Sequence, residues 1–137
     1  MHDDTSQLKS LGSQGTVYPQ TTPHAGILET FPNKYPGRDY TITHKTNEFT
    51  SRCPKTDQPD FAEIEINYIA DEKCVESKSL KLYFGAYRNE GAFMESITNK
   101  ILEDLITICA PKMMRVEAKF NARGGIATTV VAEYKKS

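Results

Sequence analysis

The chain has 137 residues, of which 38% are hydrophobic, and this length and composition predict one domain with a modest core. Its 17 basic and 18 acidic residues are interspersed and leave a formal charge of −1, which argues against a broad positive surface for direct nucleic-acid binding. No apolar run is long enough to cross a membrane, and the start of the chain lacks the apolar block of a secretory signal, so we expect a cytoplasmic protein.

The cysteines and histidines predict neither a disulfide framework nor a metal site. Cys53, Cys74 and Cys109 are an odd number at wide spacings, as expected of free thiols in a reducing compartment. No C-x-x-C pair occurs and the histidines are scattered along the chain. We therefore expect no structural metal.

The first predicted element is a polar arm. Residues 1–35 are rich in Gly, Pro, Ser, Thr and Gln and show no apolar periodicity, so we expect them to be extended or partly disordered. Residues 36–137 would then form the single folded domain. Within it, residues 38–46 and 61–70 alternate between apolar and polar side chains, which predicts two strands that pair with each other.

Two helices are predicted next. Residues 77–89 place apolar side chains at i, i+3, i+4 and i+7, which is the stripe of an amphipathic helix. A longer helix is expected from residue 92 to residue 109, with Pro111 closing it. The side chains of this helix that we expect to face inward are Phe93, Ile97, Ile101, Leu105 and Ile108.

Two strands, at residues 114–120 and 127–135, complete the predicted fold, and the glycines of residues 121–126 would form the hairpin loop between them. The order strand, strand, helix, helix, strand, strand predicts the α+β class, with a four-stranded antiparallel sheet and two helices on one face. Both sheet edges would be unpaired. We therefore expect subunits to associate into a closed ring of sheets, with functional sites built between subunits.

The loop SRCPKTDQPD, residues 51–60, carries the first candidates for chemistry. Most free cysteines are small buried hydrophobes, and Cys53 could be one of them. However, the side chains of Arg52 and Lys55 would lower the pKa of its thiol, and a loop position would keep the sulfur reachable. Asp60 is either an ordinary strand-entry residue or a carboxylate fixed against a reacting atom. The pair suggests a thiolate that attacks and an acid that delivers protons.

A second stretch, VESKSLKLY, offers binding groups at a predicted helix start. Glu76 and Ser77 fall where backbone N–H groups and a hydroxyl would be free. Lys78 and Lys81, at i and i+3, point to one side of the helix. They would either hold phosphates or form a solvated helix face.

A third stretch is GAFMES, residues 91–96. Glu95 lies off the apolar stripe of its predicted helix and can face a cleft. Its carboxylate could accept two parallel N–H bonds from a guanine-like edge, or it could complement the helix dipole as a first-turn acid. The spacing alone assigns Phe93 to the core rather than to a stacking platform.

Taken together, the motifs FTSRCPKTDQPDF, VESKSLKLY and the Phe-x-Glu of AFME resemble a known enzyme family. It is the short, single-module form of the NADPH-dependent 7-cyano-7-deazaguanine reductases, the nitrile reductases of queuosine biosynthesis, a tRNA-modification pathway. The resemblance covers most of the chain, from LGSQGT and ETFPNKYPGRDY to KFNARGGI. It implies a tunnelling fold, in which ββααββ subunits form a ring-shaped barrel, with rings that stack into a homo-oligomer.

The resemblance also implies roles for residues. Cys53 would add to the nitrile carbon of a deazapurine nucleobase to form a covalent thioimide, and Asp60 would be the proton donor. Two hydrides, each from one NADPH, would then give the aminomethyl product. Phe93 would stack on the base and Glu95 would read its amide and amino edge. The residues implied to bind substrate are Val75, Glu76, Ser77, Phe93, Met94 and Glu95, and those implied to bind NADPH are Lys78 and Lys81.

One position departs from the family pattern. The family usually has histidine just before the glutamate, where this chain has Met94. Methionine neither donates nor accepts hydrogen bonds strongly, so a proton-handling or substrate contact from that side chain would be lost.

Two other functions remain open from the sequence. A related enzyme class on the same fold uses the same thioimide but admits ammonia, forming an amidine on a base already in tRNA. The lack of a basic excess argues against this amidinotransferase. The non-enzyme alternative is a purine-binding ring in which Cys53 only senses oxidants. Only the reductase would consume NADPH when the nitrile base is added.

Overall fold

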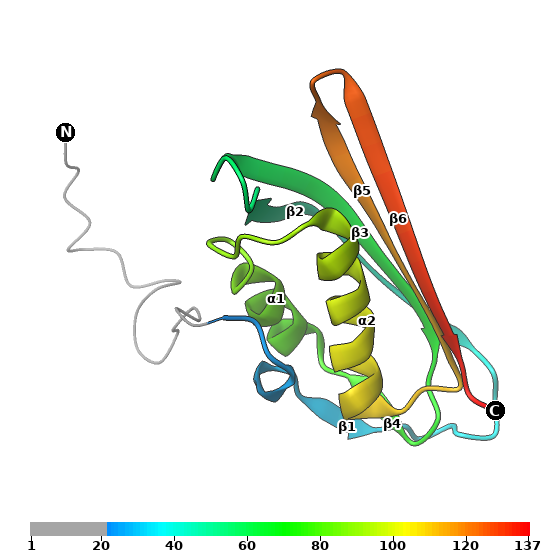
Figure 1. Cartoon of the computed structure of the whole chain (residues 1–137). Helices are drawn as coiled ribbons and strands as arrows, with labels where there is room; N and C mark the ends of the chain where they lie inside the picture. Colours follow the sequence, from blue (N-terminus) through cyan, green and yellow to red (C-terminus); the bar gives the residue numbers. More distant parts are fainter. Residues whose placement is uncertain (1–21) are drawn as a thin grey trace, which may run out of the picture.

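The computed structural model of the chain describes residues 22–137. Its main sheet has four antiparallel strands in the order β2 (Thr41–Arg52), β3 (Pro59–Ile69), β5 (Met113–Arg123) and β6 (Ile126–Lys135). Helices α1 (Ser77–Gly85) and α2 (Met94–Cys109) both lie on one face of this sheet (Figure 1). The predicted α+β class, the order of these six elements and the pairing of the first two strands are therefore confirmed.

The hydrophobic core lies between the sheet and the two helices. On β3, Ile64, Ile66 and Tyr68 face the helices, as the alternation predicted. Each aliphatic side chain buried in this way contributes about 1.5–3 kcal/mol. The side chains of α2 that complete the core are Ile97, Ile101, Leu102, Leu105 and Cys109.

Strand β2 runs further than the sequence predicted. The alternation of apolar and polar side chains breaks at Asn47 and Glu48, which is why the predicted strand ended at residue 46. The structure has a β-bulge between Thr46 and Phe49. Because a bulge adds one residue, Phe49 again points inward and pairing continues to Arg52. Cys53 therefore follows directly on a rigid strand.

The helix predicted from residue 92 begins instead at Met94, with Phe93 as its N-cap residue. A residue at this position has left the helical path, so the i, i+4 spacing to Ile97 does not turn its ring inward. The side chain of Phe93 is 64% exposed. The assignment of Phe93 to the core was therefore wrong.

A small second sheet lies at the far end of the helices from the Cys53 loop. It consists of β1 (Thr30–Pro32) and β4 (Lys73–Val75), preceded by the 3-10 turn η1 (Ala25–Ile27). Leu28 between these elements belongs to the core. Residues 22–35 of the predicted polar arm are therefore part of the folded body, whereas residues 1–21 lie outside the described residues.

The face of the main sheet turned away from the helices carries interspersed charges. Lys45 on β2 pairs with Glu63 on β3 at 3.1 Å, and Arg115 on β5 pairs with Glu133 on β6 at 3.4 Å. Within residues 22–137, β2 and β6 each have a strand on one side only. In the same range, no helix is both long and apolar enough to span a bilayer.

Candidate active site

Cys53 begins a tight loop that joins β2 to β3. Its backbone N–H donates to the carbonyl of Gln58 at 2.8 Å, and its own carbonyl accepts from the Asp57 N–H at 2.9 Å. Asp57 takes the left-handed conformation that this closure needs, with φ 62°. Arg52 reinforces this closed loop by an ion pair of 3.2 Å from its Nη1 to the Asp57 carboxylate. The loop therefore holds the sulfur in a fixed place at its base.

The environment of Cys53 favours the thiolate. Its pKa is lowered to about 6, first by a hydrogen bond from the Thr56 hydroxyl, and then by the backbone N–H groups of Thr56 and Lys55 and the guanidinium of Arg123, against an opposing effect of burial. At neutral pH most of the thiol is therefore deprotonated. The residue is only 7% exposed in the isolated chain, so the sulfur is less accessible than its loop position suggested.

The cations expected from the sequence to lower the pKa of Cys53, Arg52 and Lys55, were the wrong ones. The Arg52 guanidinium is held by the Asn89 side chain, at 3.2 Å from Nη2, as well as by Asp57. Lys55 acts through its backbone N–H and not through its ammonium group. The cation that interacts with the thiol is Arg123, whose own pKa is raised chiefly by its hydrogen bond with Cys53.

Asp60 is buried beside Cys53 and shares Arg123 with it. The carboxyl group is 7% exposed, and its Oδ1 lies 3.2 Å from Nη1 of Arg123. Arg123 is the last residue of β5, and the turn after it is formed by Gly124 and Gly125 at positive φ. One guanidinium thus links the sulfur of Cys53 to the carboxyl group of Asp60 across two strands.

Sequence reasoning missed Arg123, because NARGGI was interpreted only as a turn. A signal existed: in an antiparallel pair the start of one strand lies beside the end of the other. Ala62 of β3 pairs with Phe120 of β5, so Asp60 necessarily lies near the end of β5, where the arginine is. Thr56 was missed because hydroxyl contacts inside a loop leave no periodic pattern.

Beside this group lies a cleft of about 290 Å³ at the start of α2. Backbone hydrogen bonds from Arg52 N to Glu90 O at 2.9 Å and from Ala92 N to Arg52 O at 3.3 Å bring the segment before α2 against the end of β2. The cleft is lined by Pro54, Asp60, Ala92, Phe93, Met94, Glu95, Arg123, Ile126 and Thr128. Four of the residues singled out from the sequence, Asp60, Phe93, Met94 and Glu95, thus line one cleft, and Cys53 is linked to it through Arg123.

The predicted binding residues at the start of α1 are arranged differently from the expectation. The Glu76 side chain caps the helix, accepting from the N–H groups of Lys78 at 2.8 Å and Ser79 at 2.6 Å, and these bonds lower its pKa. The first-turn N–H groups that were expected to be free are therefore occupied. Val75 is buried in β4, where its N–H donates to the Tyr68 hydroxyl at 2.9 Å. Ser77 is exposed.

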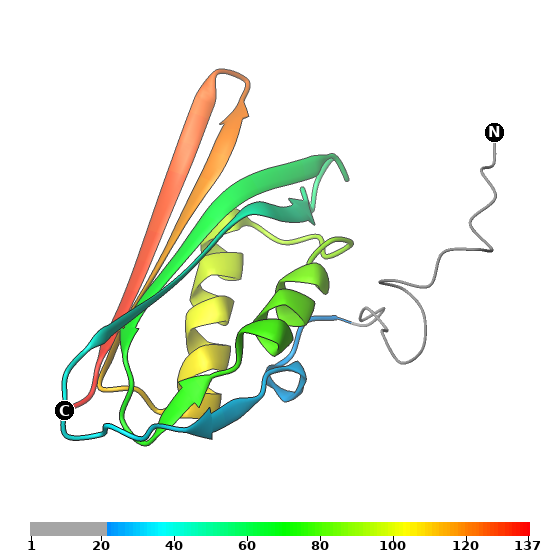
Figure 2. The same cartoon turned by 180° about the vertical axis from the view of Figure 1, so that it is seen from behind.

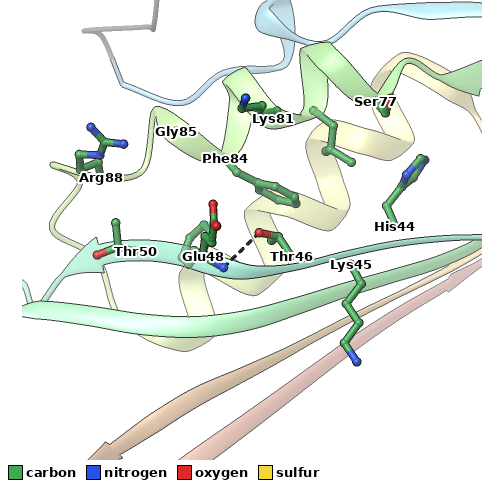
Figure 3. A pocket seen from close by; sticks show the side chains of 12 residues that line it. His44, Lys45, Thr46, Glu48, Thr50, Ser77, Lys81, Phe84, Gly85 and Arg88 are labelled. Atoms are coloured by element: carbon green, nitrogen blue, oxygen red, sulfur yellow. Dashed lines mark hydrogen bonds between the residues drawn. The ribbon is translucent and has the colours of Figure 1, made fainter. Parts of the chain in front are cut away.

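A larger cleft, of about 460 Å³, lies between α1 and β2 (Figure 3). Lys81 and Ser77 line it, whereas Lys78 does not. Figure 3 shows Lys81 and Arg88 on the helix side, while the Lys45 side chain points away from the cleft toward Glu63. The full lining is His44, Lys45, Thr46, Glu48, Phe49, Thr50, Ser77, Leu80, Lys81, Phe84, Gly85 and Arg88.

The two groups of predicted site residues lie at opposite ends of α1. Val75, Glu76 and Ser77 precede or begin the helix, which has 9 residues and is therefore about 13 Å long. The Cys53 loop is joined to the far end through the bond between Arg52 and Asn89. Figures 1 and 2 show the same separation between β4 and the loop that joins β2 to β3. One chain therefore does not bring all the predicted site residues together.

Among the described residues, no three His, Cys, Asp or Glu side chains are grouped so that they could hold a metal ion. His2 lies outside residues 22–137.

Comparisons with known proteins agree on one family. Residues 59–137 match the profile of the QueF-like protein family. A protein of Syntrophus aciditrophicus named NADPH-dependent 7-cyano-7-deazaguanine reductase is 58% identical over 134 residues, covering 98% of this chain and 91% of that one. Proteins of the same name from Nitrosococcus oceani and Chlorobaculum tepidum are 58% and 55% identical, covering 80% and 81% of this chain and 84% and 95% of theirs.

A solved structure described as the archaeosine synthase QueF-Like in the apo form superposes with a TM-score of 0.66. It covers 71% of this chain and 95% of its own, at 24% sequence identity, so the likeness concerns the fold alone. Identity above half over most of both chains is a much stronger relation. The chain belongs to the family of NADPH-dependent 7-cyano-7-deazaguanine reductases.

Proposed function

We propose that this chain reduces the nitrile group of 7-cyano-7-deazaguanine to an aminomethyl group with NADPH, as a step in queuosine biosynthesis. The observation that carries the proposal is the thiol of Cys53, with a pKa lowered to about 6, beside Asp60 and Arg123 at the edge of a cleft. A nitrile is a weak electrophile, and a thiolate present at neutral pH is the nucleophile needed to activate it.

The proposed reaction begins with addition of the Cys53 thiolate to the nitrile carbon. The new carbon–sulfur bond uses one π bond of the nitrile, and the nitrogen takes a proton from Asp60, which gives a thioimide. NADPH, when bound, would supply the hydride for each of the two reduction steps. Between them the carbon–sulfur bond breaks, which returns the Cys53 thiolate and leaves an imine to accept the second hydride. Arg123 stabilises first the thiolate and then the carboxylate that Asp60 becomes.

Glu95 and Phe93 are proposed to recognise the base in the 290 Å³ cleft. The Glu95 carboxylate can accept two N–H bonds from the amide and amino edge of a guanine-like ring. The exposed Phe93 ring offers a face for stacking. Met94 lines the same cleft, but its thioether supplies packing and no strong hydrogen bond, so proton transfer there falls to Asp60.

The residues of the 460 Å³ cleft fit the phosphate groups of NADPH. Lys81 and Arg88 line it, and ammonium and guanidinium groups are the usual partners of phosphate oxygens. The exposed Lys78 stands on the first turn of the same helix. We assign Lys78 and Lys81 to cofactor binding, with Lys81 inside the cleft and Lys78 outside it.

A second copy of the chain is proposed to complete each site. Val75, Glu76 and Ser77 are too far along α1 to reach a base held at Cys53 in the same chain, but a neighbouring subunit can bring its own α1 to that place. The strands β2 and β6, each with a free edge in the described chain, suit the closed ring of sheets that this assembly requires. If so, mixing inactive Cys53→Ala and Ser77→Trp proteins under conditions of subunit exchange restores activity, whereas neither does so alone.

The deciding experiment follows NADPH oxidation while 7-cyano-7-deazaguanine is titrated. We expect oxidation that depends on the nitrile, two NADPH per base, and none with the Cys53→Ala protein. Intact-mass measurement of the wild type with base and without NADPH should show a covalent adduct, and persistence of that adduct in Cys53→Ala would move the nucleophile elsewhere. Base-independent oxidation would refute the proposal.

The same assay separates the two other functions. An amidinotransferase that acts on tRNA would form the adduct but consume no NADPH, and a thiol sensor would do neither. The relatives at 53–58% identity all carry the reductase name, whereas the archaeosine synthase likeness is limited to the fold. We therefore take a free nucleobase as the substrate, with no direct contact to nucleic acid, and the cytoplasm as the reducing compartment that keeps Cys53 free.

A further inference from the structure

A buried hydroxyl close to the reacting groups has no hydrogen-bond partner. Ser51 lies in β2, two residues before Cys53, and is 0% exposed. Its Oγ is one of two buried side-chain polar atoms in residues 22–137 that lack a partner. Buried polar atoms are nearly always paired, because removing them from water is costly. An unpaired hydroxyl at this place therefore needs a reason.

Another buried serine shows what a purely structural role looks like. Ser79 is 3% exposed, and its hydroxyl donates to the Glu76 carbonyl at 2.8 Å and accepts from the Glu29 N–H at 2.9 Å. Those bonds fasten α1 to the segment that leads into β1. The Ser51 hydroxyl fastens nothing in the resting protein, so alanine would serve packing there equally well.

The position of Ser51 in the sheet identifies its neighbour. Ser51 and Asp60 are directly opposite each other in the pairing of β2 with β3, and both side chains are buried. Side chains opposite each other in antiparallel strands have Cβ atoms about 4.5–5.5 Å apart. A serine hydroxyl can turn among its staggered rotamers, so it can reach the Asp60 carboxyl without any movement of the backbone.

We propose that Ser51 is a positioning residue for proton transfer by Asp60, to whose carboxylate its hydroxyl donates a hydrogen bond during the reaction. The inference rests on the proton-donor role of Asp60 proposed above. The proton passes from Asp60 to the nitrogen of the former nitrile, and the carboxylate that remains accepts from Arg123 on one side and from Ser51 on the other. The hydroxyl is unpaired at rest because its bond forms only when this charge develops.

The proposal predicts that stability and activity respond in opposite ways to Ser51→Ala. Removing an unpaired buried hydroxyl costs no hydrogen bond, so the melting temperature should stay the same or rise. The turnover number kcat should fall by about 10- to 100-fold, the range expected for one hydrogen bond to a charged group, with little change in KM. Adduct formation without NADPH should become slower, because it includes the same proton transfer, but the midpoint of its pH dependence should stay at about 6, because Cys53 keeps its partners.

The matched control is Ser79→Ala, the same substitution at a buried serine with two hydrogen bonds, which should lower the melting temperature by several degrees. Unchanged kcat in Ser51→Ala, or a loss of stability like that of Ser79→Ala, would overturn the inference and leave the reductase proposal intact. If the wild type fails to oxidise NADPH with the nitrile base, both are overturned. Lower kcat with unchanged or higher melting temperature supports it.

Discussion

The sharpest test of the site concerns Thr56, whose hydroxyl makes the largest contribution to the lowered pKa of Cys53. At a pKa of about 6, roughly 90% of the thiol is deprotonated at pH 7, whereas at the ordinary thiol value of about 8.5 only about 3% would be. The whole environment therefore multiplies the reactive form by about 30-fold at neutral pH.

Replacing Thr56 by alanine removes the hydroxyl but keeps the backbone N–H groups and Arg123. We expect the pH midpoint of the Cys53 thiol titration to rise from about 6 to about 7, so that the thiolate fraction at pH 7 drops from about nine-tenths to about a half. Thr56→Ser keeps the hydroxyl and is the matched control, with a midpoint near 6.

The assay is the rate of adduct formation with the nitrile base as a function of pH, in the absence of NADPH. The rate should increase as pH rises through the thiol pKa, because only the thiolate attacks. The same depressed pKa stabilises the fold above about pH 8.5, and this contribution is lost as pH falls through about 6. A midpoint that stays near 6 in Thr56→Ala would refute the assigned cause, and an ordinary thiol midpoint in the wild type would refute the activated thiolate itself.

Two further substitutions test the neighbouring carboxylates. Asp60→Asn should still bind the base but should lose turnover, because the amide has no acidic proton to deliver, and full NADPH oxidation in this variant would remove Asp60 from the proton-donor role. Glu95→Gln should weaken binding of the base by roughly 5- to 150-fold, measured by titration calorimetry on a Cys53→Ala background, because one of two parallel N–H bonds would face an amide NH₂ group. An affinity equal to that of the Cys53→Ala protein would return Glu95 to the role of a first-turn acid at the helix dipole.

The predictable parts of the fold are the strands and helices whose buried residues recur at a regular local spacing. The alternation around Ile64 and Ile66 and the helical stripe through Ile97 and Ile101 each reflect one buried face, so neighbouring residues carry the signal. The contacts that were missed join segments distant in sequence. Strand β1 pairs three residues with three others more than forty positions away, which leaves no local pattern.

The candidate site shows the same division. Cys53 and Asp60 were found because their residue types and loop position suggest chemistry. Arg123 and Thr56 were not, because one reaches the site through strand pairing and the other through a turn inside the loop. Phe93 was misplaced because helical spacing was applied to a residue that precedes the helix.

The pair of backbone hydrogen bonds between Arg52 and the segment just before α2 limits where the chain can tolerate insertions and deletions. The same two backbone hydrogen bonds, from Arg52 N–H to Glu90 O and from Ala92 N–H to Arg52 O, position both Cys53 and the start of the helix that carries Glu95. An inserted or deleted residue anywhere from 88 to 91 would shift the helix against the sulfur, although this segment is a surface connection where length changes are normally harmless. The amide protons of Arg52 and Ala92 should therefore exchange with solvent as one cooperative unit. Insertions and deletions among related chains should be confined to other connections.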